Sequence, residues 1–284
     1  MHPRWFDPSL ADALRGISLP ARRVNAGRGD GRHASRLPGP GIEFAQFRGY
    51  QPGDDPRRVD WKLLARSDRF FVREADAETA LPLRIVLDAS RSMAHTEAGI
   101  CKFDVARQLA ATLARLAIRQ GDTPALLLLP GATIPPSRDS RQFERLLYTL
   151  DAATPTGALP AQIDRLIESA GAGRDGFLLV ITDAFDRGQQ LLRAVELSGR
   201  DAAFLVLRTQ REHDLDYCSP VLLEDLESGA TIALDVEALH GRAAEHARYR
   251  EAAIQLGVDW IALDPGVPIL GPLREWLARR AGRR

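Results

Sequence analysis

The stretch RIVLDASRSM, from Arg84 to Met93, indicates the fold of the larger part of this chain. An apolar, partly β-branched run ends abruptly on Asp88, and Ser90 and Ser92 follow at alternate positions. Short apolar runs of this kind are typical of strands that are buried on both faces of a sheet. The stretch therefore predicts a buried strand whose carboxyl end carries three oxygen-bearing side chains.

Downstream of residue 80, apolar runs alternate with helical patterns. The expected strands are LRIVL, ALLLL, FLLVIT, AAFLVL and VDWIAL, and VLLEDLESGATIALD is expected to form a hairpin. The expected helices lie at about 102–119, 140–150 and 159–170, after residue 186, at about 236–256, and around Trp276. Buried strands separated by helices predict an α/β domain over residues 81–284, with a doubly wound, mostly parallel sheet.

A second apolar run, FLLVITD, ends on Asp183 in the same way as the first ends on Asp88. In doubly wound sheets, ligands bind beyond the carboxyl ends of the strands, where the strand order reverses. If the order is the common 3-2-1-4-5-6, with residues 132–134 as a short edge strand, the first and fourth strands are neighbours. Asp88 and Asp183 are then expected to face each other across one crevice.

Residues 1–80 are expected to form an N-terminal, β-rich arm. Asp7 and Pro8 suit the N-cap and the first position of a short helix, and the Gly-, Arg- and Pro-rich residues 25–41 are expected to be a loop.

Composition excludes several classes of protein. The 284 residues contain 38 basic and 38 acidic side chains, so no overall field attracts nucleic acid or an acidic membrane. Lys62 and Lys102 are the only lysines, and all other basic residues are arginines. We attribute this preference for arginine to a GC-rich genome rather than to a recognition task. Cys101 and Cys218 lack metal-ligand spacing, and no apolar run has the length of a signal peptide or a membrane span, which favours a reduced, cytoplasmic setting.

The pattern D-x-S-x-S at Asp88, Ser90 and Ser92 suits a hard divalent cation. One carboxylate and two neutral hydroxyls on a tight turn can converge on Mg²⁺, which prefers octahedral oxygen ligands and retains several waters. Such a site would accept an outside carboxylate as its last ligand. The alternative is that both serines cap the next turn while Asp88 accepts backbone hydrogen bonds.

These residues resemble the metal-ion-dependent adhesion site of von Willebrand factor A domains, over residues 82 to about 264. Asp88, Ser90 and Ser92 resemble its first element, and Asp183 resembles its last. The resemblance implies bound Mg²⁺, with Mn²⁺ or Ca²⁺ as alternatives. It also implies a threonine from the loop DAATPTGALPAQI, for which Thr156 is the first choice and Thr154 the second. The register also allows Gly157 at that place, in which case this ligand is displaced or missing.

The segment GIEFAQFRGYQPGDDPRRVDWKLLARSDRFFVREADAET, residues 41–79, resembles the signature of the bacterial family called domain of unknown function 58. That resemblance implies association with MoxR-type AAA+ ATPases and a chaperone-like role in maturing or remodelling other proteins. Many members carry transmembrane helices upstream, which this sequence does not show. Eight residues of the segment form what we call the signature box: Arg48, Tyr50, Gly53, Asp54, Arg57, Asp60, Trp61 and Arg66.

The signature box has two possible roles. PGDD is a turn, the charged residues around it can pair, and Trp61 offers a large apolar anchor, so the box can tie the arm to the sheet domain. Alternatively, the box is a docking surface for a partner protein.

Three functions remain open: a non-enzymatic, metal-dependent protein-binding module, a metal-assisted phosphohydrolase using Asp88, and a scaffold whose metal site has decayed. The first is preferred. Phosphate-binding Gly-rich loops are absent, and His95 near Ser92 has no nucleophile elbow around it. A phosphoaspartate enzyme of the haloacid type would require an aspartate in place of Ser90 and a well-placed lysine.

Overall fold

The structure is a computed structural model that forms two compact units. It describes residues 3–19, 38–51, 56–67, 69–76, 80–169, 176–184, 187–213, 221–224, 231–234 and 236–282. One unit comprises Met1–Ala26 together with Leu81–Arg284, and the other comprises Gly27–Ala80. The first residues of the chain, which we assigned to the arm, therefore belong with the α/β unit.

A six-stranded sheet forms the centre of the α/β unit, in the order β12-β9-β8-β3-β6-β7. All neighbouring strands are parallel except β6 and β7, which are antiparallel. In chain order this is the expected 3-2-1-4-5-6 arrangement, including the short edge strand. The strands are β3 (Pro82–Asp88), β6 (Thr123–Leu129), β7 (Thr133–Ile134), β8 (Phe177–Thr182), β9 (Asp201–Leu207) and β12 (Asp259–Leu263).

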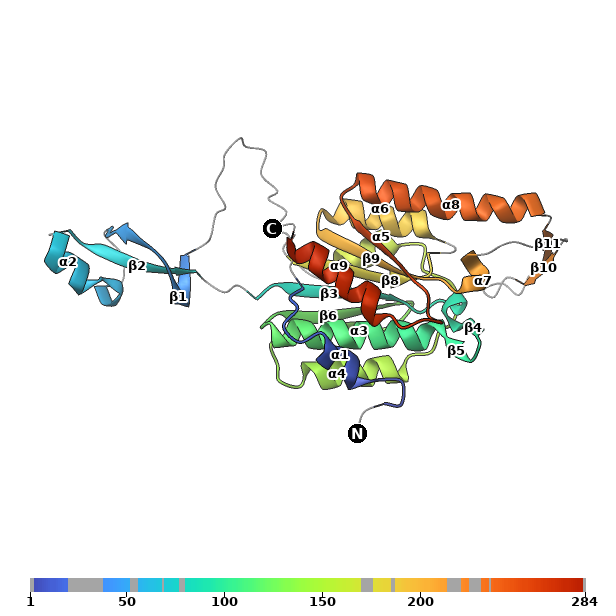
Figure 1. Ribbon diagram of the computed structural model, residues 1–284, viewed down its shortest axis with the longest axis horizontal. Coiled ribbons are helices and arrows are strands. Elements are labelled where there is room, and N and C mark those ends of the chain that lie inside the picture. The colour runs from blue at the N-terminus through green and yellow to red at the C-terminus, as the bar shows by residue number, and fades with distance from the viewer. Residues whose placement is uncertain are drawn as a thin grey trace. The chain divides into compact units, whose positions relative to one another are not determined.

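Helices cover both faces of this sheet, as a doubly wound fold requires (Figure 1). Helices α1, α3, α4 and α9 lie on one face and α5, α6 and α8 on the other. Their bounds are α1 (Pro8–Ala13), α3 (Lys102–Arg119), α4 (Gln142–Ala152), α5 (Ile163–Ser169), α6 (Gly188–Ser198), α8 (Val236–Gln255) and α9 (Leu270–Gly282).

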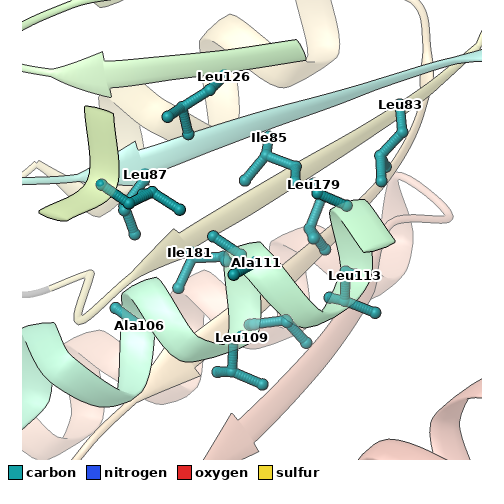
Figure 2. Packing of buried hydrophobic residues seen from close by; sticks show 14 of the residues in the cluster. Leu83, Ile85, Leu87, Ala106, Leu109, Ala111, Leu113, Leu126, Leu179 and Ile181 are labelled. Carbon is teal, nitrogen blue, oxygen red and sulfur yellow. The ribbon is translucent and has the colours of Figure 1, made fainter. Parts of the chain in front are cut away.

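The core consists of two apolar layers, one on each side of the sheet. Alternate residues of β3 enter different layers: Ile85 and Leu87 pack with α3, whereas Val86 packs with residues of α5 and α6. Figure 2 shows the first layer, in which Leu109 and Leu113 of α3 lie below the strands. Burial on both faces explains why the strands are continuously apolar rather than alternating.

The predicted cap of the first helix is confirmed. The Asp7 carboxylate accepts a hydrogen bond from the Ser9 backbone N–H at 2.8 Å, and Pro8 opens α1. The backbone of Asp7 also exchanges two hydrogen bonds with the side chain of Gln108 in α3, at 2.6 and 2.9 Å. These contacts attach α1 to the α/β unit.

Short elements complete this unit at its loops. The predicted hairpin is present as antiparallel β10 (Val221–Glu224) and β11 (Thr231–Leu234). The turn after β3 contains the 3-10 helix η2 (Arg91–Ala94), followed by antiparallel β4 (Thr96–Glu97) and β5 (Ile100–Cys101). The four-residue helix α7 (Gln210–His213) follows β9.

The smaller unit contains an antiparallel pair, β1 (Pro38–Gly49) and β2 (Phe71–Asp76), with the 3-10 helix η1 (Pro56–Arg58) and helix α2 (Trp61–Ser67) between them. The loop expected over residues 25–41 differs in part, because 38–41 belong to β1; residues 25–37 lie outside the described residues. Val59 and Val72 are buried and bridge each other.

Candidate functional site at the carboxyl ends of β3 and β8

Asp88 stands at the end of β3 and accepts three hydrogen bonds. Its Oδ1 accepts from the Ser90 backbone N–H at 2.9 Å and from Ser90 Oγ at 2.6 Å. Its Oδ2 accepts from Thr182 Oγ1, at the end of the neighbouring strand β8, at 2.6 Å. Because the side chain is only 2% exposed, these bonds replace the water that an ionised carboxylate would otherwise need.

The two serine hydroxyls of D-x-S-x-S lie beside this carboxylate. Ser90 Oγ and Ser92 Oγ are 3.1 Å apart, and Ser90 is buried. Neighbouring ligands of an octahedral Mg²⁺ are about 2.9 Å apart, since the metal–oxygen distance is 2.0–2.1 Å. The oxygen spacings around Ser90 therefore match a magnesium ligand set, and they also satisfy the alternative of a hydrogen-bonded turn.

The loop expected to supply a third ligand lies against this turn. The Thr156 backbone N–H donates to the Ala89 carbonyl, and the Arg91 N–H donates to the Gly157 carbonyl, each at 2.8 Å. Gly157 has a φ of +64°, a left-handed conformation that favours glycine. Thr156 is therefore placed beside the site with its side chain exposed. Thr154, the second choice, lies in the same loop and is also exposed.

Asp183 follows β8 directly and is 2% exposed. Thr182 fixes the backbone here, because its Oγ1 accepts from the Ala184 N–H at 2.9 Å while donating to Asp88. Ala184 has a φ of +54°, which is strained for a residue with a Cβ. The end of β8 is thus held in an uncommon conformation next to both aspartates.

Lys102 is part of the site, and our sequence analysis missed it. Its Nζ donates to Asp183 Oδ2 and to Glu212 Oε1, both at 2.8 Å, and its side chain is 1% exposed. A signal was present in the sequence: Lys102 opens the predicted helix, where the helix dipole disfavours a cation. A lysine at that position requires nearby anions.

Glu212 connects this lysine to the loop after β9. Its Oε2 accepts from the Thr209 backbone N–H at 2.9 Å, and its backbone carbonyl accepts from the guanidinium of Arg208. Thr209 and Glu212 have the spacing of a capping box, which explains how a helix as short as α7 is held. The sequence reading missed Glu212, although the T-x-x-E spacing was readable.

The electrostatics of the site follow from burial. Burial raises the pKa of Asp88 to about 6, and the negative charge of Asp183 adds to this rise, while hydrogen bonds from Ser90 and Thr182 oppose it. For Lys102, burial disfavours the charged ammonium group, but the charges of Asp183 and Glu212 outweigh burial and raise its pKa. Asp88 and Asp183 thus interact as expected for residues at neighbouring strand ends.

The signature box lies in the other unit. Asp60 caps α2, its Oδ1 accepting from the backbone N–H groups of Lys62 and Leu63 at 3.0 and 2.9 Å. Trp61 retains 62% of its surface, and Arg57 and Arg66 are also exposed. The Tyr50 and Phe70 rings lie 6.2 Å apart.

The remaining residues of the signature box are Arg48, Gly53 and Asp54. Gly53 and Asp54 lie outside the described residues. Arg48 belongs to β1, where it pairs with Val72.

Within the described ranges, no group of three or more His, Cys, Asp or Glu side chains is arranged to hold a metal ion. The expected ligand set contains only two carboxylates and otherwise hydroxyls, so it is of a different kind. In the same part of the chain, no helix combines the length and apolar character needed to cross a membrane.

Comparisons with known proteins agree with the resemblance of the signature box. The chain is 31% identical over 285 residues to the uncharacterized protein Mb1516 of Mycobacterium bovis, a match that covers 96% of this chain and 88% of the relative. Rv1480 of Mycobacterium tuberculosis, also uncharacterized, matches to the same extent. The family model described as "Protein of unknown function DUF58" matches residues 46–254. The chain therefore belongs to the DUF58 family.

Proposed function

We propose that this protein is a metal-dependent protein-binding module whose α/β unit is of the von Willebrand factor A type. The observation that carries the proposal is the group of oxygens from Ser92 and the buried Asp88 and Ser90, which lies at the strand-order reversal beside Asp183. Ligands of doubly wound sheets bind at this place. Recognition rather than turnover is the expected activity, because the Ser90 hydroxyl that contacts the Asp88 carboxylate is buried and is itself an expected ion ligand.

The ligand set favours Mg²⁺. Ser90 and Ser92 would contribute hydroxyl oxygens, Asp88 and Asp183 carboxylates, and Thr156 the third hydroxyl. Carboxylate and hydroxyl oxygens select a hard cation over zinc. The ion would supply an electrophilic centre for an Asp or Glu side chain of a partner, and it would offset the repulsion between the two buried carboxylates.

The partner that family membership favours is a MoxR-type AAA+ ATPase, which this protein would serve as a chaperone-like adaptor in the bacterial cytoplasm. The exposed Trp61, with Phe70 and Tyr50 in the same unit, offers aromatic surface that a partner could contact, which supports the docking role of the signature box. The smaller unit would then provide a second contact with the partner, independent of the ion.

The proposal is tested by calorimetric titration of the wild type and Asp88→Ala with Mg²⁺ and Mn²⁺. Saturable binding by the wild type and its loss in Asp88→Ala are expected, while Asp164→Ala, which removes an exposed carboxylate from α5, keeps the wild-type affinity. Affinity purification with the ATPase should follow the same pattern. Equal binding by all three proteins, or none by the wild type with the ATPase present, would leave a scaffold with a decayed site.

A metal-assisted phosphohydrolase is the second candidate, because Lys102 supplies the well-placed lysine that the sequence seemed to lack. Two facts oppose it: Ser90 stands where the second aspartate is required, and both oxygens of the buried Asp88 are occupied by hydrogen bonds. We expect no hydrolysis of p-nitrophenyl phosphate above the level of Asp88→Asn. If the wild type hydrolysed the substrate and a folded Asp88→Asn variant did not, the phosphohydrolase would be favoured.

A further inference from the structure

The ammonium group of Lys102 joins three elements at the carboxyl edge of the sheet. Lys102 opens α3, Asp183 follows β8, and Glu212 lies in α7 after β9. Both contacts measure 2.8 Å, as is usual for charge-assisted hydrogen bonds between an ammonium group and a carboxylate. A single buried atom therefore links one expected ion ligand to a loop that holds no ion ligand.

A packing role alone does not account for a lysine here. The N-terminus of an 18-residue helix repels a cation, and a buried ammonium group is unfavourable unless anions surround it. An apolar side chain would fill the same space without either cost. The positive charge is therefore the property that this position uses.

That charge lies where a divalent ion would also act. Asp183 is the carboxylate that the ammonium group holds, and it directly follows Thr182, whose hydroxyl donates to Asp88 at the end of the neighbouring strand. An ion bound beside Asp88 and Asp183 would have to share Asp183 with Lys102 and would be repelled by it. Lys102 has an alternative partner in Glu212, so it can give up Asp183 without being left unpaired.

The charges around the ammonium group also favour an acidic partner. The negative charges are those of Asp88, Asp183 and Glu212, and the positive charges are those of Lys102 and Arg208. Arg208 interacts electrostatically with both Asp183 and Glu212. With all five ionised, the group has one net negative charge, which a divalent ion changes to one net positive charge. A carboxylate from a partner would restore neutrality.

We propose that Lys102 is the resident cation of this site, which competes with the divalent ion for Asp183 and transmits ion binding to the loop after β9 through Glu212. The inference rests on the proposed function and identifies its specificity-determining residue. Ion binding is weak without an acidic partner, because Lys102 opposes it. When the ion takes Asp183, Lys102 moves toward Glu212, whose other oxygen holds the Thr209 N–H.

The test measures Mg²⁺ and Mn²⁺ affinity by calorimetry in full-length variants. Lys102→Met keeps the length of the side chain without its charge, and it is expected to bind the ion at least about tenfold more tightly than the wild type. Glu212→Gln leaves Lys102 to Asp183 alone, and is expected to bind several-fold more weakly. Arg145→Met removes an exposed cation from α4, outside the site, and serves as the matched control, with a change under about threefold.

Hydrogen exchange at the Thr209 amide provides the second readout. In the wild type, Mg²⁺ is expected to slow exchange at this amide, and in Lys102→Met it is expected to have no effect there. If Lys102 only stabilised the fold, Lys102→Met and Glu212→Gln would both bind the ion more weakly. Exchange at the Thr209 amide would then still respond to Mg²⁺ in Lys102→Met. If Lys102→Met does not fold, Glu212→Gln alone tests whether Lys102 opposes ion binding. This variant is expected to fold, because the Glu212 side chain is partly exposed.

The outcomes separate the two proposals. If the wild type binds Mg²⁺ but Lys102→Met and Glu212→Gln bind equally well, the role of Lys102 is refuted and the metal-dependent module stands. If neither the wild type nor Lys102→Met binds Mg²⁺ or Mn²⁺, the proposed function fails and this inference fails with it.

Discussion

Thr182 donates its hydroxyl hydrogen to Asp88 at 2.6 Å and thereby joins the ends of the two strands at which the strand order reverses. The same oxygen accepts the Ala184 N–H, so one buried threonine orients one aspartate and fixes the backbone after the other. A hydroxyl with this double role is a positioning group rather than an ion ligand.

Thr182→Val is expected to lower the free energy of unfolding by about 1–3 kcal/mol, because the buried Asp88 oxygen and the Ala184 N–H each lose a partner. Thr182→Ser keeps the hydroxyl and is the matched control, with a smaller loss. Urea denaturation of metal-free protein measures both. Equal stability of the valine variant and the wild type would show that water replaces the hydroxyl.

The raised pKa of Asp88 predicts an unusual pH dependence of stability without metal. Its folded pKa of about 6 lies above the unfolded value of about 3.9, so the folded state binds this proton more tightly. Stability from this group is present below pH 4 and is lost as the pH rises through about 6. The loss amounts to about 3 kcal/mol at pH 7.

Asp88→Asn isolates this contribution, because it imitates the neutral side chain at every pH. In EDTA, the free energies of unfolding of the two proteins should be similar near pH 4, and the variant should become more stable toward pH 7. Chemical denaturation at a series of pH values gives the difference. A constant difference across that range would mean that Asp88 titrates normally.

The sequence predicted the fold well because the sheet is buried on both faces. Continuous apolar strands such as those ending at Asp88 and Asp183 cannot lie at a surface, and helices between them leave few topologies. The strand order then placed both aspartates at one edge. The signal for each element was local, so a single sequence was sufficient.

The counter-ions of the site were harder to predict because their contacts are distant in sequence. Lys102 and Glu212 are separated by 110 residues, and neither lies in a strand. From the sequence alone, a lysine at the start of a helix suggests a surface residue whose charge is slightly unfavourable there. Its role becomes evident only when an anion is known to lie nearby.

Trp61→Ala is now expected to change the free energy of unfolding by less than about 0.5 kcal/mol, since most of the side chain already contacts water. Val72→Ala, in the same unit and 3% exposed, is the comparison and should be clearly more destabilising. Thermal and urea denaturation report stability, and affinity purification with the ATPase reports docking. A loss of several kcal/mol in Trp61→Ala would restore the structural role of the signature box.

Arg280 of α9 ties the C-terminal helix to the starts of β9 and β12. Its guanidinium group pairs with Asp201 and, at 2.6 Å, with Asp259, and it lies 4.1 Å from the centre of the Phe177 ring. Arg280 is 2% exposed. Arg280→Met would remove a buried cation that contacts both carboxylates and is expected to lower the free energy of unfolding by about 3–5 kcal/mol.

The exposed neighbour Arg279 is the matched control, and Arg279→Met should stay within about 0.5 kcal/mol of the wild type. Adding Asp201→Asn to Arg280→Met should recover part of the loss, because it removes one of the two negative charges that the arginine offset. Ion binding should not change in any of these variants when they are folded, since Asp201 and Asp259 begin the strands whose opposite ends face the site. If Arg280→Met and Arg279→Met proved equally stable, the buried network would contribute no net stability, and α9 would be held by its apolar face alone.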